Sequence, residues 1–131
     1  MIKQSEILKA VFERAKTSPA ITLVPPESIK SHIPQDAPLP YVRIRMDQAP
    51  NDDKTQFGYE TNITFDVWSK KHSDGEVSQI VDELIEAFST PLTVVGGNNF
   101  YIRRGNTVYP VEPDGQTHRA SLACRLLSHT A

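Results

Sequence analysis

Four histidines and a single cysteine are the side chains of this protein best able to bind a metal or act as a nucleophile. His32, His72, His118 and His129 fall in predicted loops, near strand ends or near the C-terminus, and none has a partner at metal-ligand spacing. Cys124 lies within an alternating apolar stretch, which is typical of a buried structural cysteine rather than a nucleophile. These residues therefore predict no catalytic group, no metal and no cofactor.

Two acidic pairs, Asp52-Asp53 and Asp82-Glu83, have the composition of paired catalytic carboxylates. Acid–base catalysis also requires a desolvated cleft that shifts pKa values. The first pair lies in a predicted polar loop beside Lys54, and the second lies on the predicted solvent face of a helix. The stretch VVGGNN lacks the GxxxxGK[ST] pattern of a phosphate-binding loop, and no helix follows it. We therefore expect a protein that is not an enzyme.

Four arginines form the main basic pattern of the chain. Arg43 and Arg45 lie on the polar side of an alternating strand pattern, and Arg103-Arg104 form a tight pair close to Tyr101. Three roles fit these residues: contacts with a nucleic-acid backbone, a hairpin end kept soluble by its charge, or salt bridges between subunits. The sequence leaves all three open.

Trp68 lies at the end of a predicted strand, out of register with the apolar positions of that strand. Tryptophan is enriched at the anchor points of protein interfaces, so Trp68 fits a contact with a partner protein. A tryptophan at the edge of the core fits equally well. Ten prolines, long loops and the lack of a catalytic group favour a chain that binds other proteins.

The composition fits one soluble domain over residues 1–131. Hydrophobic residues make up 38% of the chain and charged residues 23%, and the formal net charge is −2, which argues against a protein that wraps DNA through a basic surface. One cysteine indicates a reducing compartment. The N-terminus lacks the apolar region of a signal peptide, and no run approaches the ~18 apolar residues of a membrane span, so we expect assembly in the cytoplasm.

Apolar spacing predicts two amphipathic helices. The first has Ile7, Val11 and Ala15 on one side and ends at Thr17-Ser18-Pro19. The second begins with the capping box SDGE at 73–76, carries an apolar stripe from Val77 to Phe88, and has Asp82, Glu83 and Glu86 on its solvent side.

Period-2 alternation predicts strands in YVRIRM, YETNITFDVWSK and HRASLACRLL, with a further strand near residues 99–104. Prolines and polar residues predict loops over 25–40 and 47–57, and turns at Gly96-Gly97 and at Pro113-Asp114-Gly115. The predicted fold class is α+β, with a mostly antiparallel sheet of about four strands and two amphipathic helices packed on one face.

The order of these segments resembles the tail completion, or tail terminator, proteins of long-tailed bacteriophages and related prophages. The resemblance rests on APLPYVRIRM, on the strand that ends ITFDVWSK, on the helix SDGEVSQIVDELIEAF that follows it, and on RRGNTVYPVEPDGQTHRASLACRLL. It covers nearly the whole chain. The chain departs from common members at its end, RLLSHTA, which lacks the aromatic residue that often closes the domain.

This resemblance implies a structural protein of the virion, located in the neck region of the tail. Members of the family form a ring, usually a homohexamer, at the head-proximal end of the tail tube. The ring ends tube polymerisation and docks the head-completion or stopper protein. The implied partners are therefore further copies of this chain, the tail tube protein and the stopper protein, while DNA passes through the lumen without specific binding.

In such a ring we expect the loops over 25–40 and 47–57 to contact the neighbouring subunit or the tube. The candidate interface residues are Arg43, Arg45, Asn51, Asp52, Asp53, Lys54, Trp68, Arg103 and Arg104. The alternative from another class is a small dimeric α+β ligand-binding or regulatory domain, with its pocket between helix and sheet.

Overall fold

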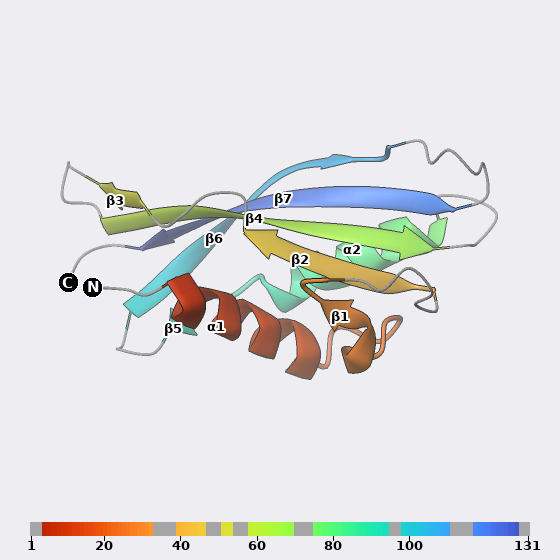
Figure 1. Cartoon of the computed structure of the whole chain (residues 1–131), viewed down its shortest axis with the longest axis horizontal. Coiled ribbons are helices and arrows are strands. Elements are labelled where there is room, and N and C mark those ends of the chain that lie inside the picture. Colours follow the sequence, from red (N-terminus) through yellow and green to blue (C-terminus); the bar gives the residue numbers. More distant parts are fainter. Residues whose placement is uncertain are drawn as a thin grey trace.

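The computed structural model describes residues 4–32, 39–46, 51–53, 58–69, 75–94, 98–110 and 117–128. These residues form two α-helices, one short 3-10 helix and seven strands (Figure 1). The helices are α1 (Gln4–Thr17), η1 (Pro26–Ser28) and α2 (Gly75–Ala87). The strands are β1 (Ile29–Lys30), β2 (Tyr41–Met46), β3 (Asn51–Asp53), β4 (Gly58–Ser69), β5 (Leu92–Val94), β6 (Asn98–Val108) and β7 (His118–Ser128). The predicted α+β class and its two helices are confirmed.

The strands form one mixed sheet in the order β1-β2-β4-β7-β6-β5, with β3 paired to β4 outside this path. β1 runs parallel to β2, and the other pairs are antiparallel. The prediction of about four strands was therefore too low. The additional strands β1, β3 and β5 have only two or three residues each. A strand of two or three residues contains too few alternations for period 2 to be recognised in the sequence. Its pairing with a neighbouring strand defines it instead.

Two segments that were predicted as loops contain regular structure. η1 and β1 lie within 25–40, and β3 lies within 47–57. Pro25 and Pro26 stand at the start of η1, where a proline loses no required hydrogen bond. The predicted capping residue Ser73 and the two predicted turns, at 96–97 and 113–115, lie outside the described residues.

The long strands β4 and β7 form the centre of the sheet, paired from Tyr59 opposite Ser128 to Ser69 opposite His118. Alternation puts Ile63, Phe65 and Val67 of β4 in the core, as predicted. The opposite face of the sheet carries the polar alternates. Within the described part of the chain, all buried apolar side chains belong to one cluster shared by the sheet and both helices.

A bulge interrupts β6 between Arg104 and Thr107, where the register against β7 shifts. Gly105 lies in this bulge, and a Cβ atom at that position would be 3.0 Å from the carbonyl oxygen of Ala123. That distance is shorter than a side chain normally tolerates, so the close approach favours glycine here.

Two charged side chains fasten the helices to the rest of the molecule. The guanidinium of Arg14 on α1 donates to the carbonyl oxygens of Ala87, Thr90 and Pro91 at the end of α2, at 3.1, 3.2 and 3.0 Å. Glu83 of α2 accepts from the backbone amides of Thr22 and Leu23, at 2.8 and 3.0 Å. Glu83 thus lies on the solvent side of α2, as predicted, where its carboxylate binds the segment around Thr22.

Candidate protein interface on the open face of the sheet

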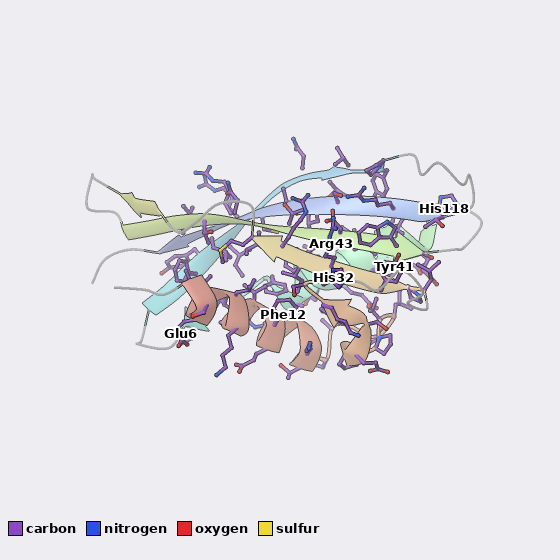
Figure 2. The ribbon with its side chains drawn as sticks, in the orientation of Figure 1. Glu6, Phe12, His32, Tyr41, Arg43 and His118 are labelled. Atoms are coloured by element: carbon purple, nitrogen blue, oxygen red, sulfur yellow. The ribbon has the colours of Figure 1, made fainter. Side chains whose placement is uncertain are left out.

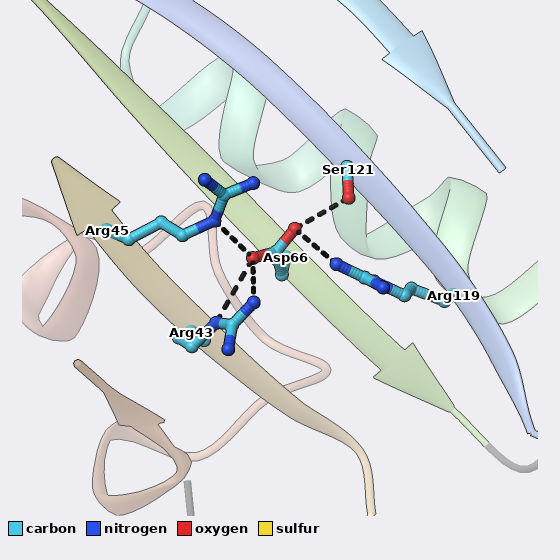
Figure 3. Close-up of polar contacts among 5 residues, drawn as sticks. All are labelled: Arg43, Arg45, Asp66, Arg119 and Ser121. Atoms are coloured by element: carbon cyan, nitrogen blue, oxygen red, sulfur yellow. Dashed lines mark hydrogen bonds and ion pairs between the residues drawn. The ribbon is translucent and has the colours of Figure 1, made fainter. Parts of the chain in front are cut away.

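Asp66 of β4 lies at the centre of a polar cluster on the sheet face opposite the helices (Figure 3). Arg43 donates to its Oδ2 from Nη2 at 2.7 Å and from Nε at 3.1 Å, and Arg45 donates from Nε at 2.9 Å. On the other side, Ser121 Oγ donates to Oδ1 at 2.6 Å and Arg119 Nη2 donates at 3.3 Å. Side chains of the two neighbouring strands, β2 and β7, thus bind one carboxylate of β4.

The position of these side chains follows from strand alternation and register. Arg43 lies directly opposite Asp66 on β2, and Ser121 lies directly opposite it on β7. The Asp66 side chain has no exposed surface, whereas Arg43, Arg45 and Arg119 keep 34%, 45% and 26% of their side-chain surface exposed. The arginines therefore cover the carboxylate and keep part of their own side-chain surface exposed.

Burial alone would raise the pKa of Asp66. The hydrogen bonds from Ser121, Arg43 and Arg45, together with the positive charge of Arg45, outweigh burial and lower this pKa to about 2. Asp66 is consequently ionised at every physiological pH. The cluster is a charged anchor that holds three arginines in place rather than a proton donor or acceptor.

Trp68 lies beside this cluster, between two arginines. The guanidinium carbons of Arg43 and Arg119 lie 5.2 and 5.0 Å from the centre of its ring system. Tyr41 packs against the indole with ring centres 5.1 Å apart and a tilt of 44°. Trp68 is half-buried on the open face, which confirms that it is out of register with the core. Stacked guanidinium and aromatic groups form a stiff surface with both apolar and charged parts.

The basic surface continues along the same face to β6 and β7. Arg103 and Arg125 lie opposite each other in the sheet, and both are exposed. We call this surface the arginine face and define it by five arginines, Asp66 and Trp68. The five arginines are Arg43, Arg45, Arg103, Arg119 and Arg125. Among the side chains that the structure describes, Asp66 is the single acid on this face, against these five arginines.

The structure separates the candidate residues that the sequence analysis had grouped. Arg43, Arg45, Trp68 and Arg103 lie on the arginine face. Arg104 pairs with Cys124, so it lies on the other side of the sheet. Asn51, Asp52 and Asp53 form β3 at one end of β4. Lys54 lies outside the described residues.

Sequence reasoning missed Arg119, Ser121 and Arg125 as members of this site. All three are outward positions of β7, and only the β4–β7 register brings them beside Asp66 and Asn62. The sequence does contain a signal for the two arginines, because Arg119 and Arg125 both occupy polar positions of the alternating stretch HRASLACRLL. Tyr41 and Asp66 were assigned to the correct side of their strands but were not selected as site residues.

An open groove of about 330 Å³ lies between α2 and the β6–β7 hairpin on the helix side. Ile85, Phe88, Ile102 and Leu122 are among the residues that line it, with Arg104 and Cys124. Burial raises the pKa of the Cys124 thiol to about 11, and the nearby charge of Arg104 opposes this only in part. Cys124 is therefore a protonated, buried thiol at neutral pH, as expected of a structural cysteine.

The two described histidines lie far from each other. His32 follows β1 and His118 begins β7, and Figure 2 shows them well separated. In the described parts of the chain, no three His, Cys, Asp or Glu side chains are grouped so that they could hold a metal ion.

None of the described helices has the length and apolar character needed to cross a bilayer.

A model of the tail completion protein gp17 family matches residues 9–129. The chain belongs to this family. The family is one of structural proteins of phage tails, so this tail completion protein is a component of the virion. No curated protein matches the chain.

The fold of this tail completion protein is also found among solved structures. It is similar to a chain from the virion of a native gene transfer agent particle, with a TM-score of 0.77 and 15% identity over 96% of both chains. At that identity the likeness concerns the fold alone. It nevertheless shows that the arrangement of sheet and helices recurs over nearly the full length of both chains.

Proposed function

We propose that this tail completion protein forms a ring at the head-proximal end of the tail tube. The ring ends polymerisation of the tube and joins the tail to the head. Membership of the tail completion family over residues 9–129 carries this proposal. Its partners are further copies of the chain in a homohexamer, the tail tube protein and the head-completion or stopper protein. The ring subunit is the single domain predicted over residues 1–131.

The arginine face supports this proposal because it is built to contact something outside the subunit. The guanidinium groups of Arg43, Arg45 and Arg119 are held by Asp66 or Trp68, so they have little side-chain entropy left to lose on binding. Arginine and tryptophan are also enriched at the energetic centres of protein interfaces. We propose that Arg43, Arg45, Trp68 and Arg103 contact a partner through this face, and that β3, with Asn51–Asp53, contributes a second contact.

DNA passes through the proposed ring without specific binding. Each chain carries a formal net charge of −2, so six copies carry on the order of −12. A phosphate backbone gains little from a ring of that net charge. We expect weak or no retention of DNA at physiological salt in a gel-shift assay.

Particles produced without this chain test the proposed function. Negative-stain electron microscopy should then show overlong tails, or tails without heads. Tails of normal length attached to heads would overturn the proposal. Light scattering of the purified chain addresses the alternative of a dimeric ligand-binding domain that uses the groove beside α2. A dimer whose melting temperature rises with a small ligand would favour that alternative.

A further inference from the structure

We propose that neighbouring copies of this chain pack head to tail, with the arginine face of one copy on the acidic surface of α2 of the next. This inference rests on the proposed ring and specifies which two surfaces close it. The partner at the arginine face is thus a second copy of the same chain. The observation behind it is a separation of charge between the two sides of the subunit.

The helix α2 is the acidic counterpart of the arginine face. Its sequence, Gly75–Ala87, contains four acidic residues and no basic one. Glu76 binds Ser69, and Glu83 binds the segment around Thr22, so these two acids are engaged within the subunit. Asp82 and Glu86 are exposed and lie one turn apart, on the side of α2 that faces away from the core. We call Asp82 and Glu86 the acidic pair.

The two charged surfaces lie on opposite sides of the same two strands. α2 packs on the core face of β4 and β7, while Asp66 and Ser121 of those strands lie on the other face. Figure 3 looks onto the arginine face and shows α2 behind the strands. One subunit therefore presents the arginine face in one direction and the acidic pair of α2 in the reverse direction.

This arrangement favours a head-to-tail contact over a two-fold symmetric one. A two-fold contact between two arginine faces would bring five arginines against five others, with Asp66 as the one carboxylate on each side among the side chains that the structure describes. Stacking different surfaces brings unlike charges together and leaves an arginine face available at one end and an acidic pair at the other. Such contacts close into a ring when the rotations between neighbours add up to a full turn, and a ring is the assembly that the proposed function requires.

Nucleic acid is the other ligand that a basic surface suggests, and the observations favour it less. Three of the five arginines are already directed at Asp66, which leaves fewer donors for phosphates. A surface for DNA also has no need of a matching acidic pair on the reverse side of the same subunit. Binding of a second copy of the chain accounts for both the arginine face and the acidic pair.

Charge reversal tests the pairing. Variant A carries R103E and R125E, two arginines outside the Asp66 cluster, and variant B carries D82K and E86K. Each changes the net charge by four units in opposite directions. The matched controls are K9E with K16E for variant A, and E13K with E27K for variant B, since all four of these side chains are exposed on α1 or η1. Native mass spectrometry of the purified chains and imaging of isolated tails report assembly.

The pairing predicts a distinctive set of results. Variants A and B should each lose the ring, with association at least tenfold weaker, while both controls should form rings as the unaltered chain does. An equimolar mixture of A and B should form complexes that use the intact arginine face of B and the intact acidic pair of A. The other contact in such a mixture joins the reversed surface of A to the reversed surface of B, whose charges are again opposite, so alternating copies of A and B should close a ring. A chain that carries all four changes should recover ring formation.

Other results would overturn the pairing. If variants A and B form rings as readily as the controls, different surfaces join the subunits, and the proposed function stands without this inference. If variant A assembles normally but loses affinity for DNA, the arginine face binds nucleic acid instead. If the unaltered chain forms no ring either in solution or on tails, the proposed function itself fails.

Discussion

Asp66 is the residue on which the open face of the sheet depends. A buried carboxylate gains from its arginines only when hydrogen bonds compensate for its desolvation, and here five such bonds do so. The arginines depend on Asp66 in turn, because Arg43, Arg45 and Arg119 would repel one another without it. We therefore regard Asp66 as a positioning residue for the arginine face.

The substitution Asp66→Asn should lower the free energy of unfolding by roughly 2–3 kcal/mol. This figure is smaller than the ~3–5 kcal/mol typical of breaking a fully buried ion pair, because the partner arginines are partly exposed and solvent screens their charges. Urea denaturation of the monomer measures it. Asp82→Asn, at an exposed position of α2, is the matched control and should change stability by less than about 0.5 kcal/mol. Equal stability of the two variants would contradict the role assigned to Asp66.

The same carboxylate should make stability depend on pH in the acid range. The folded-state pKa of Asp66, about 2, lies below the ordinary value of 3.8, so the unfolded chain takes up a proton that the folded chain resists. This stabilisation is complete above pH 3.8 and is lost as the pH falls toward 2. The difference corresponds to roughly 2 kcal/mol. Urea denaturation at several pH values should show this loss in the unaltered chain and a weaker dependence in Asp66→Asn.

At the scale of elements, the end of α2 is held by a side chain from α1. The last carbonyl groups of a helix lack partners within the helix, and Arg14 supplies donors to Ala87 and to Thr90 and Pro91 beyond it. Its guanidinium also lies 5.9 Å from the ring centre of Phe88. Arg14 thus joins two helices that are separated by most of the first half of the chain.

Replacing Arg14 with methionine should lower the free energy of unfolding by about 1–2 kcal/mol, because several carbonyl groups lose a charged donor. Amide hydrogen exchange should accelerate at the C-terminal turn of α2. Lys16→Met removes the same charge from an exposed position of α1 and serves as the control. If the two variants are equally stable, the contacts of Arg14 do not contribute to holding α2.

The elements also show where sequence reasoning succeeded. β2, β4, β7 and both helices were predicted with nearly their observed bounds, because each carries several repeats of its period. β6 was predicted near residues 99–104 but runs to Val108, since the bulge at Gly105 breaks its alternation. β1, β3 and β5 are strands because a neighbouring strand pairs with each of them. The local sequence pattern contains no information about that pairing.

At the scale of the whole molecule, the segment from 47 to 57 remains a candidate contact with neighbours or with the tube. Its strand β3 pairs with the end of β4, beyond the buried centre of the sheet. A change here should therefore affect assembly far more than folding.

Deletion of residues 50–55 should leave a cooperatively folded chain whose melting temperature falls by only a few degrees. Tails produced with this variant should fail to terminate, which electron microscopy of isolated particles reveals as overlong or headless tails. A deletion variant that still yields normal tails joined to heads would show that this segment makes no essential contact. Circular dichroism of the purified variant separates loss of assembly from loss of folding.

The sequence by itself determined the α+β class, both helices, the long strands and the face of the sheet on which Arg43, Arg45, Asp66 and Trp68 lie. These features follow from periodicity, and periodicity is a local property of the chain. Only the tertiary structure decided that Arg119, Ser121 and Arg125 join them, and that Arg104 does not join Arg103. The register between β4 and β7 places Asp66 opposite Ser121, 55 residues later in the chain, and so decides which side chains meet. That register is set by the packing of the whole sheet on its helices.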